Sequence, residues 1–473
     1  MQPTRTWELA YPSSRSLPQS ANGHRHGATV AAHGPQPAWE LAYPPTHTPP
    51  SSPASASYVA PARIPAQGNG RRMQALRREL HAAWDAIIDE AAENGTYTLG
   101  SAVRQFEELI EDAWTPPGSK IHAVMVNSGT TALYGALVAC GIKPGDAVIV
   151  PAMTFISTAL SCAWVGATPI FVDITPGTWT MNVDAVHALL EEHKSLRRTI
   201  KAVIPVHLYG GIMPDMADLL DLALDEHWKV IEDASQAHGA SLIVDGETWH
   251  AGTMSDVGCL SMSGVKNAGV AEDGGCLLTH SPEMAEFLRV WRDLGRRPGD
   301  RYGFHVPGVR GRMGKLAAAS GMVQFRHLDK WNARRREIAA RYTIAIHDAK
   351  LPLSAPAEPE GSTSAYYKYV VVAETPAARE RLEDCLEEAN IETEHYYPRI
   401  LPEQPVYQTG QLPYVITGDL AVSRHLASCG TCLPIYPELL PEEQERVITA
   451  VKRAFSGKRQ QASMGRAESL EPA

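Results

Sequence analysis

Seven short runs of strand-forming residues alternate with helical patterns between residues 120 and 280, and this alternation constrains the fold more than any other feature of the chain. The runs cover residues 124–127, 147–151, 169–173, 202–205, 230–233, 258–261 and 276–279. Strands that alternate with helices are joined by crossover connections, so they lie mostly parallel in one sheet. We therefore predict an α/β domain with a mostly parallel seven-stranded sheet between helices.

Composition divides the 473 residues into four segments. Residues 1–70 are rich in Pro, Ser, Ala, Gly and His, which predicts a disordered extension. Apolar residues at helical spacing begin at about residue 71, so we place a large domain at 71–335. A smaller C-terminal α+β domain is predicted at 336–457, with a helix at 441–455, and a disordered tail at 458–473.

Two features of these segments admit further interpretation. The extension contains the sequence Trp-Glu-Leu-Ala-Tyr-Pro at residues 7–12 and again at 39–44. We interpret this repeat as a local duplication, and a docking segment for a partner is the alternative. A charged helix is predicted at 327–342 between the two domains, and we expect its three consecutive arginines, Arg334 to Arg336, to face solvent.

Charge and hydrophobicity argue against several classes of partner. The chain has 43 Lys and Arg against 53 Asp and Glu, a formal net charge of −10. This balance opposes binding to nucleic acid or to an anionic membrane. No apolar run reaches the roughly 18 residues of a membrane helix, and no signal peptide is recognisable. With an odd number of cysteines, most of them in apolar stretches, we expect a cytoplasmic protein without a metal site, in which the pair Cys429 and Cys432 is structural.

The segment at residues 126–133 joins the end of a predicted strand to the start of a helix. It reads Val-Asn-Ser-Gly-Thr-Thr-Ala-Leu. The free N–H groups and positive dipole end of such a helix attract an anion, Thr130 adds a hydroxyl donor, and Gly129 permits close backbone approach. Phosphate binding is one interpretation, and ordinary helix capping by Ser and Thr is the other.

A carboxylate ends the run at 230–233. Ligands of doubly wound sheets bind at the carboxyl ends of the strands, where Asp233 is expected to lie. At that place Asp233 can bind Mg²⁺, cap a helix or pair with a protonated ring nitrogen. The strand alone does not decide among these roles.

Lys266 is the single lysine in a loop of small residues that follows the run at 258–261. Desolvation lowers the pKa of a lysine amine, and a neutral amine can form an imine and carry protons. Ser261, at the end of the strand, is then a further candidate for phosphate binding. The alternative is a surface lysine in an ordinary loop.

Taken together, these three segments match the requirements of one cofactor. Pyridoxal 5'-phosphate needs a phosphate cradle, a carboxylate at its pyridine nitrogen and a lysine that forms a Schiff base. A fourth segment, Pro-Ala-Met-Thr-Phe at 151–155, also follows a strand. Phe155 either lies flat against the pyridine ring or belongs to the core.

With these residues in place, the sequence resembles the DegT/DnrJ/EryC1/StrS family of sugar and cyclitol aminotransferases, which are fold-type I pyridoxal-phosphate enzymes. The matching segments follow one another along most of the chain: Thr98-Leu99-Gly100, Ser128-Gly129-Thr130, residues 151–155, residues 205–210, residues 232–239, Lys266-Asn267, residues 272–275, Arg312-Met313 and residues 433–437. The resemblance implies a homodimer with shared active sites.

The resemblance also implies a role for each candidate residue. Lys266 forms the Schiff base and carries the proton, Asp233 pairs with the ring nitrogen, and Gln236 contacts the side of the ring hydroxyl. The other implied cofactor ligands are Phe155 on the ring and Gly129, Thr130 and Ser261 at the phosphate.

The chain departs from the family pattern in one segment. Family members usually have Asn at the position of Arg310, and commonly a Ser/Thr-Glu pair where this chain has Gly314-Lys315. By resemblance, residues 308–313 reach the cofactor of the neighbouring subunit. We expect Arg310 to pair with phosphate there and so to contribute to cofactor binding.

The predicted reaction moves an amino group from glutamate or glutamine to a nucleotide-linked keto sugar or to a free keto cyclitol, as in amino-sugar, aminocyclitol or antibiotic biosynthesis. Residues 395–399, His-Tyr-Tyr-Pro-Arg, are expected to approach this acceptor. The alternatives are a dehydratase of the same superfamily, which typically has His in place of the lysine, and a non-catalytic scaffold subunit. The lysine at position 266 favours transamination over dehydration.

Overall fold

A computed structural model describes residues 62–116 and 118–467, with side chains up to Ser456. The repeat at 7–12 and 39–44 therefore lies outside the described residues. Packed structure is already present before the predicted residue 71, since Ile64 forms a parallel bridge with Ile391.

One eight-stranded sheet organises the large α/β part of the described chain. Its strands stand in the order β1-β9-β8-β5-β4-β2-β3-β13. Seven of them correspond to the predicted runs: β1 (His122–Val126), β2 (Ala147–Pro151), β3 (Thr168–Val172), β4 (Ile200–Val203), β5 (Lys229–Asp233), β8 (Val257–Ser261) and β9 (Gly275–Thr279). In this sheet β9 runs antiparallel to β1 and β8, and the remaining pairs are parallel. The predicted α/β fold is confirmed.

The eighth strand corrects the predicted strand count. β13 (Val415–Ile416) comes from near the C-terminus and pairs in parallel with β3. A strand of two residues is too short to show alternation in the sequence, so the pattern gave no sign of it.

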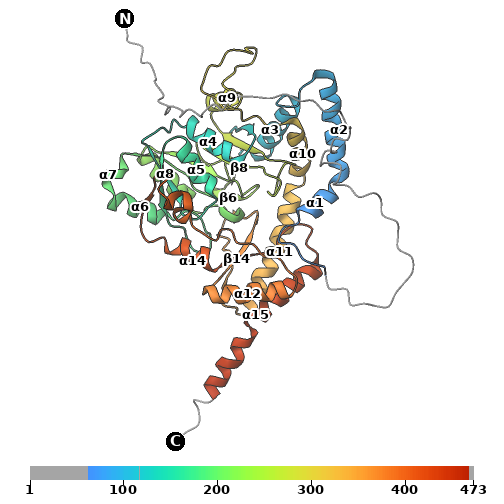
Figure 1. Cartoon of the computed structure of the whole chain (residues 1–473), viewed down its shortest axis with the longest axis vertical. Helices are drawn as coiled ribbons and strands as arrows, with labels where there is room; N and C mark the ends of the chain where they lie inside the picture. The colour runs from blue at the N-terminus through green and yellow to red at the C-terminus, as the bar shows by residue number, and fades with distance from the viewer. Residues whose placement is uncertain (1–61, 117, 468–473) are drawn as a thin grey trace, which may run out of the picture. The chain divides into compact units, whose positions relative to one another are not determined.

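Helices cover both faces of the sheet. Ala123 and Met125 of β1 belong to one core cluster, while Val124 and Val126 belong to the other, as the two-residue period of a strand requires. The first cluster includes residues of α3 (Ser101–Trp114), α6 (Val183–Glu192), α8 (Met216–Asp225) and α10 (Lys315–Phe325). The second includes residues of α4 (Gly129–Ala139), α5 (Ile156–Trp164) and α9 (Pro282–Trp291). Figure 1 shows α10 beside α3 and α2 (Arg77–Asn94), with which it is in contact.

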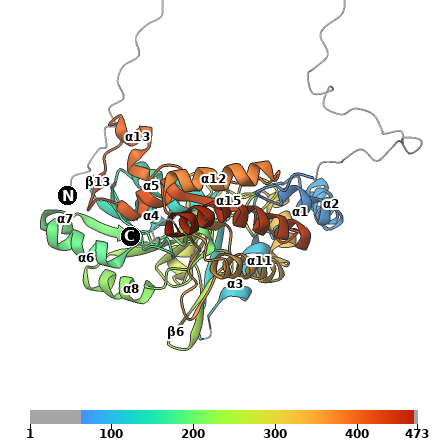
Figure 2. The same ribbon diagram turned by 90° about the horizontal axis from the view of Figure 1, so that it is seen from below.

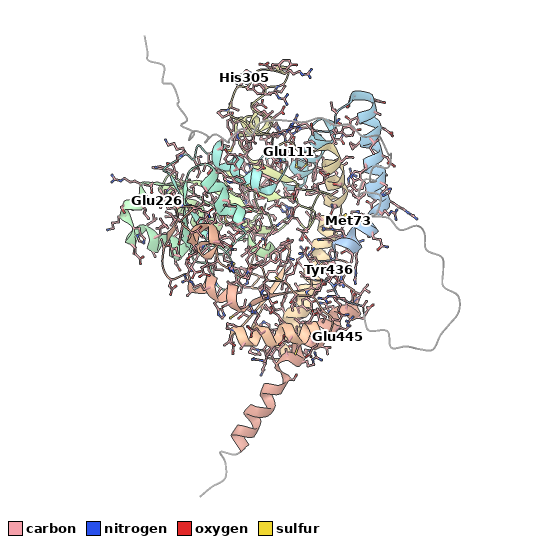
Figure 3. The ribbon with its side chains drawn as sticks, viewed as in Figure 1. Met73, Glu111, Glu226, His305, Tyr436 and Glu445 are labelled. Carbon is pink, nitrogen blue, oxygen red and sulfur yellow. The ribbon has the colours of Figure 1, made fainter. Side chains whose placement is uncertain are left out.

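Carboxylates of α3 occupy the outer edge of β1, the first strand of the sheet. Glu111, labelled in Figure 3, accepts a hydrogen bond from the N–H of Ala123 at 2.9 Å. Glu107 accepts one from the N–H of Met125 at 3.0 Å, and Arg292 donates both to Glu107 and to the carbonyl of Met125. Side chains thus satisfy backbone groups that a further strand would otherwise bind.

The C-terminal region, residues 349–456, contains a second sheet. Its strands stand in the order β10 (Leu353–Ser354), β12 (Tyr369–Ala373) and β14 (Gly430–Leu433), all antiparallel. The helix α11 (Leu328–Asp348) leads into this region, and α12 (Pro376–Glu388) lies beside α15 (Pro441–Ala467), as Figure 2 shows. α15 extends past the predicted helix end at residue 455 into residues predicted as a disordered tail. The predicted division into domains remains a prediction.

Several short elements complete the described fold. A hairpin of β6 (Ser241–Val244) and β7 (Glu247–His250) pairs with β11 (Ser362–Thr363). The short helices are α1 (Asn69–Ala75), α7 (Lys194–Arg197), α13 (Pro405–Gln408), α14 (Ala421–Cys429) and two 3₁₀ turns, η2 (Leu208–Gly210) and η3 (Leu401–Glu403). Among the described residues, every helix is too short or too polar to cross a membrane.

The expectation that all three arginines of α11 face solvent is wrong for Arg335. This side chain is buried, and its Nη1 donates to the carbonyls of Ile435 at 2.8 Å and Tyr366 at 3.1 Å. Charged neighbours in the sequence suggested a solvated helix face, but the backbone of the C-terminal region covers this position.

Candidate active site

A cavity of about 400 Å³ opens at the edge of the sheet where the parallel strands end. Seven of the eight predicted cofactor residues line it: Gly129, Thr130, Phe155, Asp233, Gln236, Ser261 and Lys266. This edge is where doubly wound sheets bind their ligands, because the loops after the parallel strands converge there.

Asp233 ends β5 and supplies a buried carboxylate with a fixed orientation. Its Oδ2 accepts a hydrogen bond from Thr158 Oγ1 at 2.8 Å, and its Oδ1 accepts one from the N–H of Ser235 at 3.1 Å. Hydrogen bonds to an ionised acceptor are stronger than neutral ones, and these two fix the direction in which the carboxylate points. The sequence did not indicate Thr158, because a hydroxyl within a helical pattern carries no sign of the direction in which it points.

Lys266 brings an amine into the same cavity. Its Nζ lies 4.7 Å from the centre of the Tyr367 ring, and within the described part of the chain it has no hydrogen-bonding partner. Burial lowers the pKa of Lys266 to about 8, with Asp233 opposing this shift and Lys368 adding to it. A neutral amine is therefore accessible near physiological pH. Tyr367 is a second residue that the sequence did not indicate.

The start of α4 and the end of β8 form a narrow cradle at one end of the cavity. Ser128 caps the helix by accepting a hydrogen bond from the N–H of Thr131 at 3.0 Å. A Cβ atom on Gly129 would lie 2.6 Å from the Cβ of Ser261, so only glycine lets the two segments approach this closely. Thr130 Oγ1 lies 2.8 Å from Ser157 Oγ. The first-turn N–H groups of a helix have no acceptor within it, so this cradle suits a phosphate.

An amide and several aromatic rings also line the cavity. Gln236 donates from Nε2 to the hydroxyl of Tyr397 at 3.0 Å and accepts at Oε1 from the N–H of Tyr209 at 2.8 Å. Phe155 is half-exposed, and its ring centre lies 5.8 Å from that of Tyr397. Tyr396 also lines the cavity.

Two other residues of the predicted acceptor segment lie elsewhere. His395 pairs with Glu383, and Arg399 is exposed and is not part of the cavity lining. Of residues 395–399, the structure therefore brings Tyr396 and Tyr397 to the cavity.

Arg310 is the predicted cofactor residue that lies outside the cavity of its own chain. Its side chain is exposed, and its backbone bridges to Asp293 at the base of the loop between α9 and α10. Figure 3 labels His305 on the same loop. A contact between Arg310 and a bound phosphate therefore needs a second copy of the chain, and its role stays a prediction.

These features define the class of the protein: an α/β enzyme in which a lysine, a buried carboxylate and an anion cradle converge at the carboxyl ends of parallel strands. The chain belongs to the DegT/DnrJ/EryC1/StrS aminotransferase family, whose model matches residues 79–452. The resemblance and the predicted aminotransferase class are confirmed.

Named relatives cover most of the chain. It is 36% identical to a dTDP-3-amino-3,4,6-trideoxy-alpha-D-glucose transaminase of Streptomyces venezuelae, over 80% of this chain and 94% of the relative. It is also 36% identical to a pleiotropic regulatory protein of Geobacillus stearothermophilus, over 78% of this chain and 93% of the relative. Among solved structures, S. venezuelae DesV in complex with a ketimine intermediate matches with a TM-score of 0.74 and 32% identity, over 84% of this chain and 99% of that one.

Proposed function

We propose that this protein is a pyridoxal-phosphate-dependent aminotransferase that delivers an amino group to a nucleotide-linked keto sugar. One observation carries the proposal: Lys266 and the oriented carboxylate of Asp233 face the same cavity as a helix-start anion cradle. These are the three groups that the cofactor requires.

The residues present fit pyridoxal phosphate. The cradle at Gly129, Thr130 and Ser261 is narrow and rich in donors, and two hydrogen bonds fix the orientation of the Asp233 carboxylate. Lys266 has an amine without a competing hydrogen bond from the described residues. When bound, the cofactor supplies an electron sink for charge that develops on the substrate carbon.

Each residue then has a defined task. Asp233 keeps the pyridine nitrogen protonated, because an oriented carboxylate stabilises a cation beside it. Lys266 holds the cofactor through its amine in the resting enzyme. The same amine would move a proton to and from the substrate carbon, which requires a group that is partly neutral at the working pH.

The acceptor class follows from the relatives and from the cavity. Named family members act on nucleotide-linked amino sugars, and the cavity is lined by Tyr396 and Tyr397, residues whose hydroxyl groups can both donate and accept hydrogen bonds. Glutamate or glutamine is the proposed donor. We also propose a homodimer, in which the loop that bears Arg310 supplies phosphate contacts to the neighbouring cavity.

The absorption spectrum of the purified protein tests this function. With pyridoxal phosphate bound we expect a visible band, which glutamate, added without an acceptor, should replace by the near-ultraviolet band of the aminated cofactor. Lys266→Ala should abolish turnover, while Lys143→Ala, a change at an exposed lysine, should not. Normal turnover in Lys266→Ala would refute the assignment.

The relative named as a regulatory protein supports a second candidate, a non-catalytic subunit. The same spectrum separates the two functions. A chain that forms no visible band with added pyridoxal phosphate would favour the non-catalytic role.

A further inference from the structure

Arg72 is a buried arginine whose guanidinium group binds the loop that carries Lys266. The residue lies in α1 and is 2% exposed. Its Nη1 donates to the carbonyl of Lys266 at 2.9 Å, and its Nη2 donates to the carbonyl of Gly264 at 2.7 Å. The planar guanidinium therefore holds the loop at two points, and a residue with a single donor atom cannot reproduce this contact.

Besides these two carbonyls, the guanidinium of Arg72 donates from Nη2 to Oδ1 of Asn69 at 2.9 Å. Within the described residues it forms no ion pair, and its guanidinium carbon lies 5.5 Å from the centre of the Trp331 ring. A buried cation without a carboxylate costs free energy unless its hydrogen bonds offset the loss of water. An apolar side chain could fill the same space without that cost, so these hydrogen bonds, two of them to carbonyls of the loop, are the feature that requires an arginine here.

The other face of the loop is also fixed. Asn267, the residue after Lys266, donates from Nδ2 to Asn332 Oδ1 at 3.0 Å and to the carbonyl of Ala365 at 2.8 Å. Arg72 and Asn267 together restrict the backbone around Lys266, so the side chain that carries the amine starts from a fixed Cα position.

The segment that precedes Arg72 is fastened to the C-terminal region. The N–H of Glu392 donates to the carbonyl of Ile64 at 2.9 Å, and Arg71 forms an ion pair with Glu443 at 2.6 Å. A Cβ atom on Gly68 would lie 2.3 Å from the ring of Tyr436, which Figure 3 labels. Residues 64–72 thus connect the C-terminal region to the Lys266 loop.

Arg72 lies outside the part of the chain that defines the family. The family model matches from residue 79 onward, whereas the contacts to the loop come from α1, which ends at Ala75. The catalytic loop is therefore supported by a segment that precedes the matched region.

We infer that Arg72 is a positioning residue that holds the Lys266 loop in the geometry needed for cofactor binding. This inference rests on the proposed function. It predicts that removing the guanidinium group weakens cofactor binding and loosens residues 264–267 before it affects the rest of the fold.

The test uses the full-length apo-protein and two neighbouring arginines. Arg72→Met keeps an unbranched apolar side chain but removes the donors. The dissociation constant of pyridoxal phosphate, measured by absorbance titration, should rise at least tenfold, and amide hydrogen exchange at residues 264–267 should become faster. Arg71→Met, which loses the ion pair with Glu443 but no contact to the loop, should bind the cofactor within twofold of the parent.

Each outcome decides the inference. Unchanged cofactor affinity and exchange in Arg72→Met would overturn it, and so would an equal effect of Arg71→Met, because the effect would then be general. Should Arg72→Met not fold, Arg72→Lys, which keeps the charge but not the planar pair of donors, must show the same two changes. If the parent chain binds no pyridoxal phosphate, the proposed function fails, and hydrogen exchange in the apo-protein still shows whether Arg72 holds the loop.

Discussion

The cavity around the Lys266 amine favours its neutral form, and this should lower the free energy of unfolding of the apo-protein at neutral pH. Burial lowers the pKa of Lys266 from 10.5 to about 8. Since one pKa unit corresponds to about 1.36 kcal/mol, this shift costs the folded apo-protein about 3 kcal/mol at neutral pH. Lys266→Met has no amine to desolvate. We therefore expect this variant to be inactive and yet more stable than the parent apo-protein by up to about 3 kcal/mol at pH 7.

The pH dependence gives the prediction its sign. The folded pKa is lower than the unfolded one, so the folded state binds fewer protons between pH 8 and 10.5, and the stability contribution of Lys266 rises with pH across that window. The cost is fully present below pH 8 and disappears above the unfolded pKa. At pH 10 the advantage of the variant should have fallen to about 1 kcal/mol.

The assay is denaturant unfolding of both apo-proteins at pH 7 and pH 10, followed by circular dichroism. Comparing the variant with the parent at each pH cancels other groups that titrate in this range. Lys143→Met, at an exposed lysine, serves as the control and should match the parent at both pH values. A Lys266→Met protein that is no more stable at pH 7, or that differs from the parent equally at both pH values, would show that water still solvates the amine.

Two further changes test other contacts. Lys315 is buried, and its Nζ lies 2.9 Å from a carboxylate oxygen of Glu90, so Lys315→Met should lower the melting temperature, opposite in sign to Lys266→Met. A higher melting temperature in Lys315→Met would contradict the role of this ion pair. Gly129→Ala places a Cβ against Ser261 and should weaken pyridoxal-phosphate binding at least tenfold in absorbance titration. As the control, Gly70→Ala places a Cβ where no atom lies within 4 Å and should bind the cofactor as the parent does. Equal cofactor affinities of the two variants would refute the cradle.

The sheet could be predicted from the sequence because its strands are buried on both faces. Such strands read as short apolar runs, as in Ala-Val-Ile-Val at residues 147–150. The principal candidate residues could be predicted for the same reason, since Gly129, Asp233 and Lys266 each end or follow such a run. Their meeting in one cavity follows from the parallel arrangement of the strands.

The remaining contacts depend on tertiary packing and leave no periodic signal. Thr158 resembles any other hydroxyl in a helix until α5 turns it toward Asp233. The run of arginines predicts a solvated helix face for Arg335, and nothing in the sequence singles out Arg72. Only the fold shows that backbone carbonyls accept hydrogen bonds from both side chains. The phosphate contact predicted for Arg310 involves a second copy of the chain, so a single chain does not show it.

The side chains along β1 also limit how two copies of this protein can associate. Glu111 and Glu107 already accept hydrogen bonds from the N–H groups of Ala123 and Met125, and Arg289 and Arg292 donate to the carbonyls of the same two residues. A strand from another molecule therefore finds these backbone groups already paired. Continuous growth of the sheet from chain to chain is blocked at this end. Subunits that meet on this side of the molecule must therefore do so through the helices and loops that flank β1, and not through an added strand.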